Sequence, residues 1–265
     1  MELMVIDNDV NRCKFFDHLN IDRVFIDLEK IGKDIRQKGL NTVKSNHNIS
    51  DIGKIKSAVV NSKVLVRINP FYSGTINEID QCIEAGADII MLPYFRRKEE
   101  VLAFIEAVGG RVRTCLLLET AAAFFRIEEI VAIDGIDEIH IGLNDLYLDL
   151  GLDFILEVYR SPLLEAVCCL IRDKGISLGI GGVASIGSGL VDGKDVLQEI
   201  IRLGGERVIL SRSFNKDNLD VFRVQLSEFR SFLNEILADN YNLENNFNRR
   251  IFLKKIESIS KLEVR

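Results

Sequence analysis

The 265-residue chain lacks several features that would set it apart from soluble cytoplasmic proteins. It has no run of about 20 apolar residues, which a membrane-spanning helix needs. Residues 1–12 contain neither the basic stretch nor the apolar stretch of a secretory signal peptide. The five cysteines are odd in number and scattered, with no CxxC pair and no Cys/His metal spacing. We therefore expect a cytoplasmic protein without a membrane segment, whose cysteines are buried free thiols.

A concentrated basic charge is also missing. The net charge is −6, whereas binding to the phosphates of nucleic acid needs a basic face. Nucleic acid is therefore not an expected partner, although a small anionic substrate needs only two or three local cations. The 47% hydrophobic and 28% charged residues are typical of a globular protein, and α/β barrels of about 250 residues fold as one domain.

One pattern recurs along the chain: a short apolar, β-branched run ends in a polar residue and is followed by an amphipathic stretch of helical period. Near-continuous apolar strands are typical of a parallel sheet that is covered on both faces. Eight such units favour a single (β/α)₈ TIM barrel over residues 1–238, with an open doubly wound sheet as the alternative. The runs are 3–7, 23–29, 63–69, 88–94, 113–119, 138–145, 177–184 and 207–213.

Two helices are predicted after the eighth strand. Residues 218–239 carry apolar positions at helical spacing and should form the last barrel helix. The polar break 240–246 then separates them from a shorter helix over 249–260. The C-terminal helical tail, 239–265, is too small to be an independent domain, so it either packs on the barrel wall or reaches a neighbouring subunit.

Glu119 and Asp145 close the fifth and sixth runs, about one β-α repeat apart. Active sites of these barrels lie at the carboxyl ends of the strands, and neighbouring strands are about 4.8 Å apart, so the two carboxylates can share one cation. Oxygen ligands of this kind suit Mg²⁺ or Mn²⁺, while the absence of a strand-end histidine argues against a His-rich zinc site. The alternative is that one carboxylate caps the next helix and the other makes a structural ion pair.

Arg67 ends the third run and is the natural partner for an anionic substrate. Its guanidinium fork can hold a carboxylate through two parallel hydrogen bonds. Opposite a metal, it would fix a 2-oxo acid, and the metal would act as a Lewis acid that takes up the charge of an enolate. The alternative is a salt bridge from Arg67 to Glu29 or Asp27.

Three further features of the sequence would lie at the same end of the predicted barrel, where the carboxyl ends of the strands meet. His47 follows the second strand in a loop that can reach over the barrel mouth, as an acid–base residue or as a surface histidine. Arg96 and Arg97 follow the fourth strand and would meet a phosphate or a coenzyme A tail, unless they only begin a solvated helix. The stretches 179–189 and 211–215 occupy the usual phosphate position of such barrels. His140, inside the sixth run, is more typical of a packed strand residue.

With these residues in place, the chain resembles the HpcH/HpaI aldolase and citrate lyase β-subunit family. The most specific match is Glu119-Thr120 together with GLNDLYLDLG (142–151), which is similar to the family's GPNDLSxDLG signature. The resemblance implies a metal-dependent barrel that makes or breaks a C–C bond next to pyruvate, another oxo acid or an acyl-CoA, and that commonly forms homo-oligomers. The other matching stretches are 24–33, 65–70, 85–93 and 116–124.

The resemblance also implies roles for individual residues. Glu119 and Asp145 would hold Mg²⁺ or Mn²⁺, Arg67 would bind the substrate carboxylate, and Glu29 would be bonded to a metal-bound water. Three polar residues in the matching stretches are expected to contact the substrate: Asn69, Thr120 and Asn144.

Two positions depart from the family pattern. Lys30 stands where the pyruvate aldolases of the family carry a proton-transferring histidine, and Leu143 replaces the proline of the signature. The citrate lyase branch has an aspartate at the position of Lys30, so DLEK (27–30) matches neither branch. A lysine with an ordinary pKa is a poor base at neutral pH. The catalytic acid–base residue is therefore predicted to be His47 or Lys30.

The favoured interpretation is a metal-dependent carbon–carbon lyase of the aldolase type that acts through a pyruvate-like enolate. A citryl-CoA-lyase-like enzyme with a CoA-linked or phosphorylated substrate is the first alternative. A barrel that has lost its base and only binds ligands is the second. A Schiff-base aldolase that uses Lys30 is disfavoured, because Asp145 stands where a lysine would have to close the sixth strand.

Overall fold

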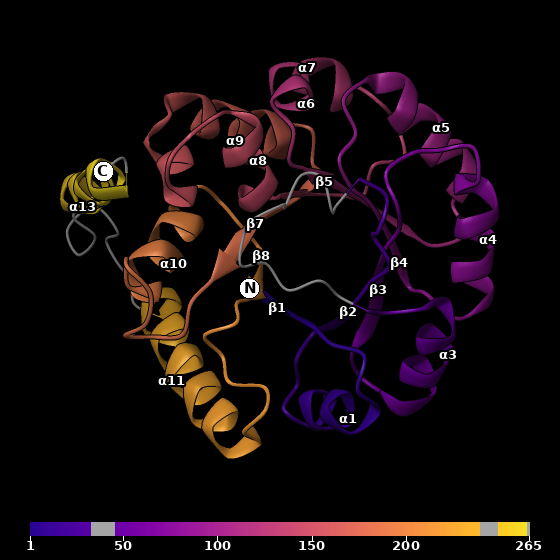
Figure 1. Ribbon diagram of the computed structural model, residues 1–265, viewed down its shortest axis with the longest axis horizontal. Coiled ribbons are helices and arrows are strands. Elements are labelled where there is room, and N and C mark those ends of the chain that lie inside the picture. Colours follow the sequence, from indigo (N-terminus) through magenta and orange to yellow (C-terminus); the bar gives the residue numbers. More distant parts are fainter. Residues whose placement is uncertain (33–45, 239–248, 264–265) are drawn as a thin grey trace.

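A computed structural model describes residues 1–32, 46–238 and 249–263. Its eight parallel strands form a closed barrel in chain order, with β8 paired to β1 (Figure 1). The (β/α)₈ architecture expected from the repeated pattern is therefore confirmed. The strands are β1 (Glu2–Ile6), β2 (Arg23–Asp27), β3 (Lys63–Arg67), β4 (Ile89–Leu92), β5 (Arg113–Leu118), β6 (Glu138–Ile141), β7 (Ser177–Val183) and β8 (Arg207–Leu210).

Helices surround the ring of strands and cover its outer face (Figure 1). Side-chain caps define several of their starts: Asp9 accepts a hydrogen bond from Arg12 N, and Ser161 accepts one from Leu163 N, just after Pro162 at the first helical position. The described helices are α1 (Val10–His18), α3 (Ile49–Ala58), α4 (Thr75–Glu84), α5 (Lys98–Val108), α6 (Ala121–Phe125), α7 (Ile127–Ile130), α8 (Leu143–Asp149), the 3₁₀ helix η1 (Ile155–Arg160), α9 (Pro162–Asp173), α10 (Gly193–Arg202), α11 (Leu219–Ala238) and α13 (Arg249–Glu263).

The inside of the barrel is filled by side chains that alternate with those facing the helices. This inner cluster includes Phe25, Met91 and Leu117, all buried, and it forms an apolar layer across the middle of the barrel. The strand residues between them, such as Val24 and Leu116, belong to the larger core under the helices. The period-2 alternation of each strand thus supplies two cores from one sheet.

A charged cluster closes the amino-terminal end of the barrel. Glu138, which is completely buried, accepts hydrogen bonds of 2.6 and 3.0 Å from Nη1 and Nη2 of Arg23. Arg113 Nη2 lies 3.1 Å and Arg207 Nε 3.4 Å from the same carboxylate. A buried carboxylate is tolerable here because three guanidinium groups surround it.

The strand ends correct one part of the sequence prediction. β6 ends at Ile141, and Gly142 is the N-cap of α8, so Asp145 lies in the first turn of that helix and does not close the strand. Glu119 is the residue directly after β5. The apolar residues of LNDLYLD extend the strand-like run into the helix, which explains the misplaced boundary.

The C-terminal part follows the predicted pattern. The helices expected over 218–239 and 249–260 are present as α11 and α13, whereas the polar break 240–246 lies outside the described residues. α13 lies outside the ring of barrel helices, against η1 (Figure 1). Its Phe252 is buried, and the ring centroid of Phe252 is 5.9 Å from that of Tyr159. Helix α13 therefore covers part of the barrel wall.

Two further expectations concern the whole chain. All five cysteines are free thiols, and four of them are buried as expected, but Cys169 is exposed, so the expectation of burial is wrong for this residue. In the part of the chain that the structure describes, no helix combines the length and the apolar character that crossing a bilayer requires.

Candidate functional site

The carboxyl-terminal mouth of the barrel holds a cavity of about 1120 Å³. Seven of the eight strands, or the segments that directly follow them, contribute residues to its wall, so the closed sheet brings together segments that are distant in sequence. Five of the predicted site residues line this one cavity: His47, Arg67, Glu119, Asn144 and Asp145.

Glu119 and Asp145 are both buried, with exposed fractions of 2% and 5%. Tyr94 N donates a 3.1 Å hydrogen bond to Glu119 Oε1. Gly142 leaves the room that the Glu119 carboxylate occupies, because a Cβ at that position would lie 2.9 Å from Glu119 Oε2. The glycine that starts α8 therefore allows the carboxylate of the β5 end to approach the turn that carries Asp145.

This donor set fits a hard divalent cation. Two carboxylates reach the cavity, and Mg²⁺ is commonly held by one or two protein carboxylates with water and substrate oxygens as its other ligands. Over the described ranges, no group of three or more His, Cys, Asp and Glu side chains is arranged to hold a metal. Glu119 and Asp145 would therefore be a partial ligand set that needs other oxygens to complete it.

Arg67 and Asp27 form a buried ion pair on neighbouring strands. Arg67 Nε donates to Asp27 Oδ1 and Nη2 donates to Oδ2, each at 2.9 Å. Burial lowers the pKa of Arg67, but the negative charges of Asp27 and Glu29 outweigh it and hold the pKa above its ordinary value. The salt bridge considered as the alternative is thus present, and it uses the two-pronged face that the sequence analysis assigned to a substrate.

Glu29 and Lys30 are not among the residues that line the cavity. Glu29 is buried, and its Oε2 lies 3.4 Å from Arg67 Nη2, so it belongs to the ion-pair group around Arg67. The Lys30 side chain is exposed, and its backbone N–H donates to Asn69 Oδ1 at 2.8 Å. This position weakens the case for Lys30 as the acid–base residue.

Asn69 and Thr120 make structural hydrogen bonds instead of lining the cavity. Asn69 Nδ2 donates to Glu78 Oε1 at 2.7 Å, and Asn69 Oδ1 accepts from the chain after β2. Thr120 Oγ1 donates to the carbonyl of Phe95 at 2.7 Å and caps α6. The predicted substrate contacts of Asn69 and Thr120 therefore find no support in the geometry, whereas Asn144 remains at the cavity.

His47 lies in the cavity wall, as expected for a loop residue that reaches over the mouth. It is 7% exposed, and its Nδ1 accepts a 3.0 Å hydrogen bond from the backbone N–H of Asp27. Burial lowers the pKa of His47, and the charge of Asp27 opposes this shift only in part. The ring is therefore neutral at pH 7, with its proton on Nε2.

Comparison with known proteins assigns the chain to a family. The model of the HpcH/HpaI aldolase/citrate lyase family matches residues 9–168, which include every residue predicted for the site. The chain belongs to the HpcH/HpaI aldolase/citrate lyase family. The resemblance drawn from the motifs is thus confirmed.

Two relatives of this chain are named as aldolases. The 4-hydroxy-4-methyl-2-oxoglutarate aldolase cghB of Chaetomium globosum is 25% identical over 153 residues, covering 45% of this chain and 56% of the relative. The hydroxypyruvate/pyruvate aldolase of Rhizorhabdus wittichii is 33% identical over 78 residues, covering 26% of this chain and 31% of the relative. The chain thus spans about half the length of the first relative and about a third of the second.

The family fold is shared with solved structures. An HpcH/HpaI aldolase/citrate lyase family protein from Burkholderia cenocepacia J2315 superposes with a TM-score of 0.61 and 15% sequence identity. The match covers 86% of this chain and 94% of that protein. At 15% sequence identity, this similarity shows that the two proteins share the barrel fold and nothing further.

Several residues of the cavity wall were not predicted from the sequence. Arg12 and Lys216 line the cavity beside Asp7, although 204 positions separate the two cations. Asp7 is the last residue of the run 3–7, and Arg12 lies five residues later on α1. No sequence pattern links Lys216 to them, because only the closure of β8 onto β1 brings it there.

His140 is among the residues that line the cavity, and it is packed within its strand, as predicted. It is completely buried in β6, and its Nε2 lies 3.1 Å from the carbonyl oxygen of Gly181. Burial lowers the pKa of His140 to about 3. The neutral ring leaves no room for a side chain at Gly179, where a Cβ would lie 2.2 Å from His140 Nδ1.

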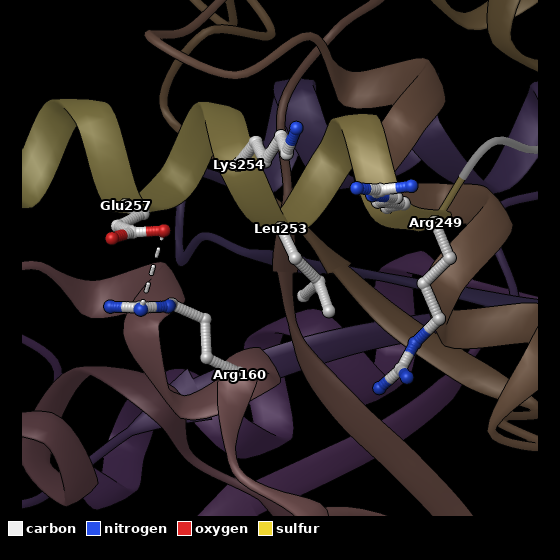
Figure 2. A pocket seen from close by; sticks show the side chains of 6 residues that line it. Arg160, Arg249, Leu253, Lys254 and Glu257 are labelled. Atoms are coloured by element: carbon white, nitrogen blue, oxygen red, sulfur yellow. Dashed lines mark ion pairs between the residues drawn. The ribbon is translucent and has the colours of Figure 1, made fainter.

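A second, smaller cavity of about 420 Å³ lies on the outer wall, between α13 and η1. Figure 2 shows Glu257 of α13 facing Arg160 of η1, and Leu253 pointing into the space between the two helices. This cavity lies away from the barrel mouth. It lies where α13 packs against η1 on the outside of the barrel.

Proposed function

We propose that the chain is a carbon–carbon lyase of the aldolase type, dependent on Mg²⁺ or Mn²⁺, that acts on pyruvate or a similar 2-oxo acid. The observation that carries the proposal is that two buried carboxylates, Glu119 and Asp145, and the cation Arg67 line one cavity at the barrel mouth. Membership of the HpcH/HpaI family and relatives named as aldolases support the reaction class.

Glu119 and Asp145 are the residues that would hold the metal ion. When bound, the ion supplies Lewis acidity that stabilises negative charge developing on a substrate oxygen. Asp27 holds the guanidinium of Arg67 in one orientation through two hydrogen bonds. The Nη1 donors of Arg67 are then the ones proposed to bind the substrate carboxylate, with Asn144 as a further polar group in the cavity wall.

His47 is proposed as the residue that donates a hydrogen bond from its Nε2–H to the carbonyl oxygen of the acceptor. Its Nδ1 is engaged by the backbone N–H of Asp27, so the N–H that remains is on Nε2. Lys30, the other acid–base candidate, is exposed and is not among the residues that line the cavity. The geometry therefore favours His47 over Lys30.

The test is deuterium exchange into the methyl group of pyruvate, measured by NMR in D₂O with Mg²⁺ or Mn²⁺ and with EDTA. We expect metal-dependent exchange that falls by at least about 100-fold in Glu119→Gln and Asp145→Asn, because each loses a metal ligand. Glu99→Gln, an exposed carboxylate on α5, is the matched control and should behave like the unsubstituted chain.

A second readout measures the metal without catalysis. Calorimetric titration with Mn²⁺ should show binding that is weakened in Glu119→Gln and Asp145→Asn but not in Glu99→Gln. Exchange that persists in EDTA would contradict the metal dependence. Mn²⁺ binding without exchange of any 2-oxo acid would instead support a barrel that binds ligands without catalysis, and would overturn the enzyme proposal.

A further inference from the structure

The two carboxylates proposed to hold the metal come from different structural elements. Glu119 directly follows β5, whereas Asp145 lies in the first turn of α8. Two such groups can share one cation only if the β5 end and α8 are held at a fixed separation. Asp149, the last residue of α8, lies four positions after Asp145 and therefore on the same face of the helix.

The loop after β4 holds the segment that carries Glu119 from one side. Tyr94 N donates a 3.1 Å hydrogen bond to Glu119 Oε1, and the carbonyl oxygen of Phe95 accepts a 2.7 Å bond from Thr120 Oγ1. Tyr94 has a φ of +52°, in the left-handed region that few residues other than glycine adopt, and in this conformation its N–H reaches the carboxylate. These bonds fix Glu119 relative to β4 but not relative to α8.

Asp149 supplies the connection to α8. Ala121 N, two residues after Glu119, donates a 2.8 Å hydrogen bond to Asp149 Oδ2. The Asp149 side chain is only 19% exposed, and a hydrogen bond to an ionised carboxylate is about twice as strong as one between neutral groups. A carboxylate in the last turn of a helix is unfavourable for that helix, because the C-terminal end of its dipole is negative. The contacts of Asp149 outside α8 must therefore offset this cost.

Arg96 is the second partner of Asp149. Its Nη2 donates to Asp149 Oδ1 and to Tyr94 Oη, each at 3.0 Å, and thereby joins α8 to the loop after β4. The Arg96 side chain is 45% exposed, however, and ion pairs in contact with solvent contribute little to stability. Of the two polar contacts of Asp149, the bond from Ala121 N is therefore the stronger one.

We propose that Asp149 is a positioning residue for the metal site. By accepting the hydrogen bond from Ala121 N, it fixes the carboxylate of Glu119 relative to that of Asp145, so that both reach one cation. Asp149 is not among the residues that line the main cavity, so it acts only through the two ligands. The inference rests on the proposed metal site and adds to it a residue outside the cavity.

Calorimetric titration with Mn²⁺ tests the role of the Asp149 carboxylate. We expect Asp149→Ala to weaken Mn²⁺ binding at least about tenfold, as loss of a group that orients a metal ligand typically does. Asp149→Asn keeps an oxygen acceptor for Ala121 N and should stay within about threefold of the parent. Arg96→Met removes only the exposed partner and should do the same. Asp173→Ala, which replaces an exposed aspartate at the last position of α9, is the matched control and should bind like the parent.

The same hydrogen bond can be removed from its donor side. Ala121 is the first residue of α6 and follows Thr120, whose backbone is extended, so a proline is tolerated at this position but lacks the N–H. Ala121→Pro should also weaken Mn²⁺ binding about tenfold. The double variant with Asp149→Ala should bind no more weakly than either single variant, because both substitutions remove one and the same bond.

Deuterium exchange into pyruvate separates a positioning role from general damage to the fold. At Mn²⁺ concentrations well above its own Kd, Asp149→Ala should regain at least about a third of the parent's exchange rate, because mass action restores the bound metal. Asp145→Asn, which loses a ligand, should not recover. Failure of Asp149→Ala to recover would mean that the substitution damages more than metal binding, and would overturn the inference.

The affinities also distinguish this inference from the proposed function. Unchanged Mn²⁺ binding in Asp149→Ala, or equal losses in Asp149→Ala and Asp149→Asn, overturns the positioning role and leaves the lyase proposal in place. A parent that binds Mn²⁺ but exchanges no deuterium defeats only the proposed reaction, and the calorimetric series then decides the inference by itself. A parent that binds no Mn²⁺ overturns both.

Discussion

Arg67 and Asp27 are direct neighbours across the β2–β3 pair and are joined by two parallel hydrogen bonds. The guanidinium carbon also lies 5.5 Å from the centre of the Phe25 ring. The cation proposed to bind substrate is therefore fixed on the barrel before any ligand arrives. A pre-oriented group loses less entropy when it binds a ligand.

Replacing this cation should affect stability as well as catalysis. We expect Arg67→Met to lower the free energy of unfolding by about 3 kcal/mol, because it leaves the buried Asp27 and Glu29 without their counter-charge. Arg67→Lys keeps the charge and should cost less, yet it loses the fork and should also lose most of the pyruvate exchange. Urea unfolding and deuterium exchange check the two effects. Equal stability of both variants and the parent would contradict this account of the ion pair.

The space at Gly142 predicts an effect on the metal site. Gly142→Ala would place a methyl group 2.9 Å from Glu119 Oε2, so the carboxylate must move. We expect Mn²⁺ affinity, measured by calorimetry, to fall at least about tenfold. Gly53→Ala in α3 is the control, since its Cβ meets only Ala85 O at 3.6 Å and alanine favours a helix. Unchanged affinity in Gly142→Ala would mean that Glu119 does not hold the ion.

The environment of His47 predicts the acid limit of the reaction. Burial lowers its pKa from 6.5, so the ring stays neutral and keeps its hydrogen bond from Asp27 N through pH 6.5 and is protonated only at lower pH. The acid limb of kcat/KM for aldol cleavage should therefore lie below pH 6.5. His47→Ala should lower kcat by about 100-fold, and His47→Gln, which keeps an N–H donor, should recover part of it. An acid limb above pH 6.5, or the same limb in both variants, would argue for another residue.

His140 predicts a pH dependence of folding. In the unfolded chain a histidine takes up a proton near pH 6.5, whereas the folded His140 stays neutral down to about pH 3. Between these values the unfolded state binds more protons than the folded state. The contribution of His140 to the free energy of unfolding is therefore fully present above pH 6.5 and decreases by about 1.4 kcal/mol per pH unit below it. Urea unfolding of the parent and of His140→Gln should show a shallower loss in the variant. Parallel curves would show that His140 titrates alike in both states.

The repeated alternation of apolar runs and amphipathic stretches was sufficient to predict the barrel, because each strand of a parallel sheet must be apolar on both faces. Glu119 and Arg67 could be placed at the cavity for the same reason, since they directly follow or end such runs. Asp145 was assigned to a strand end, because the apolar residues around it continue the pattern into α8.

Other parts of the site depend on contacts that no local pattern records. Thr120 is next to Glu119 in sequence but caps α6, because a side chain one residue further on points to the helices instead of the barrel axis. Lys216 reaches Asp7 only through the closure of the barrel, which is a long-range property. The role of a residue near a strand end thus depends on whether its side chain points to the barrel axis or to the helices. The position of the residue in the sequence alone does not determine that direction.

The charged cluster around Glu138 and the apolar layer at Phe25 fill the amino-terminal part of the barrel, so a ligand would enter the main cavity through the rim at the carboxyl-terminal end. Arg67 ends a strand and rests on Phe25, whereas Lys216 belongs to a loop beyond the strands. Under the proposed function, both substrates would therefore enter and leave through this one rim.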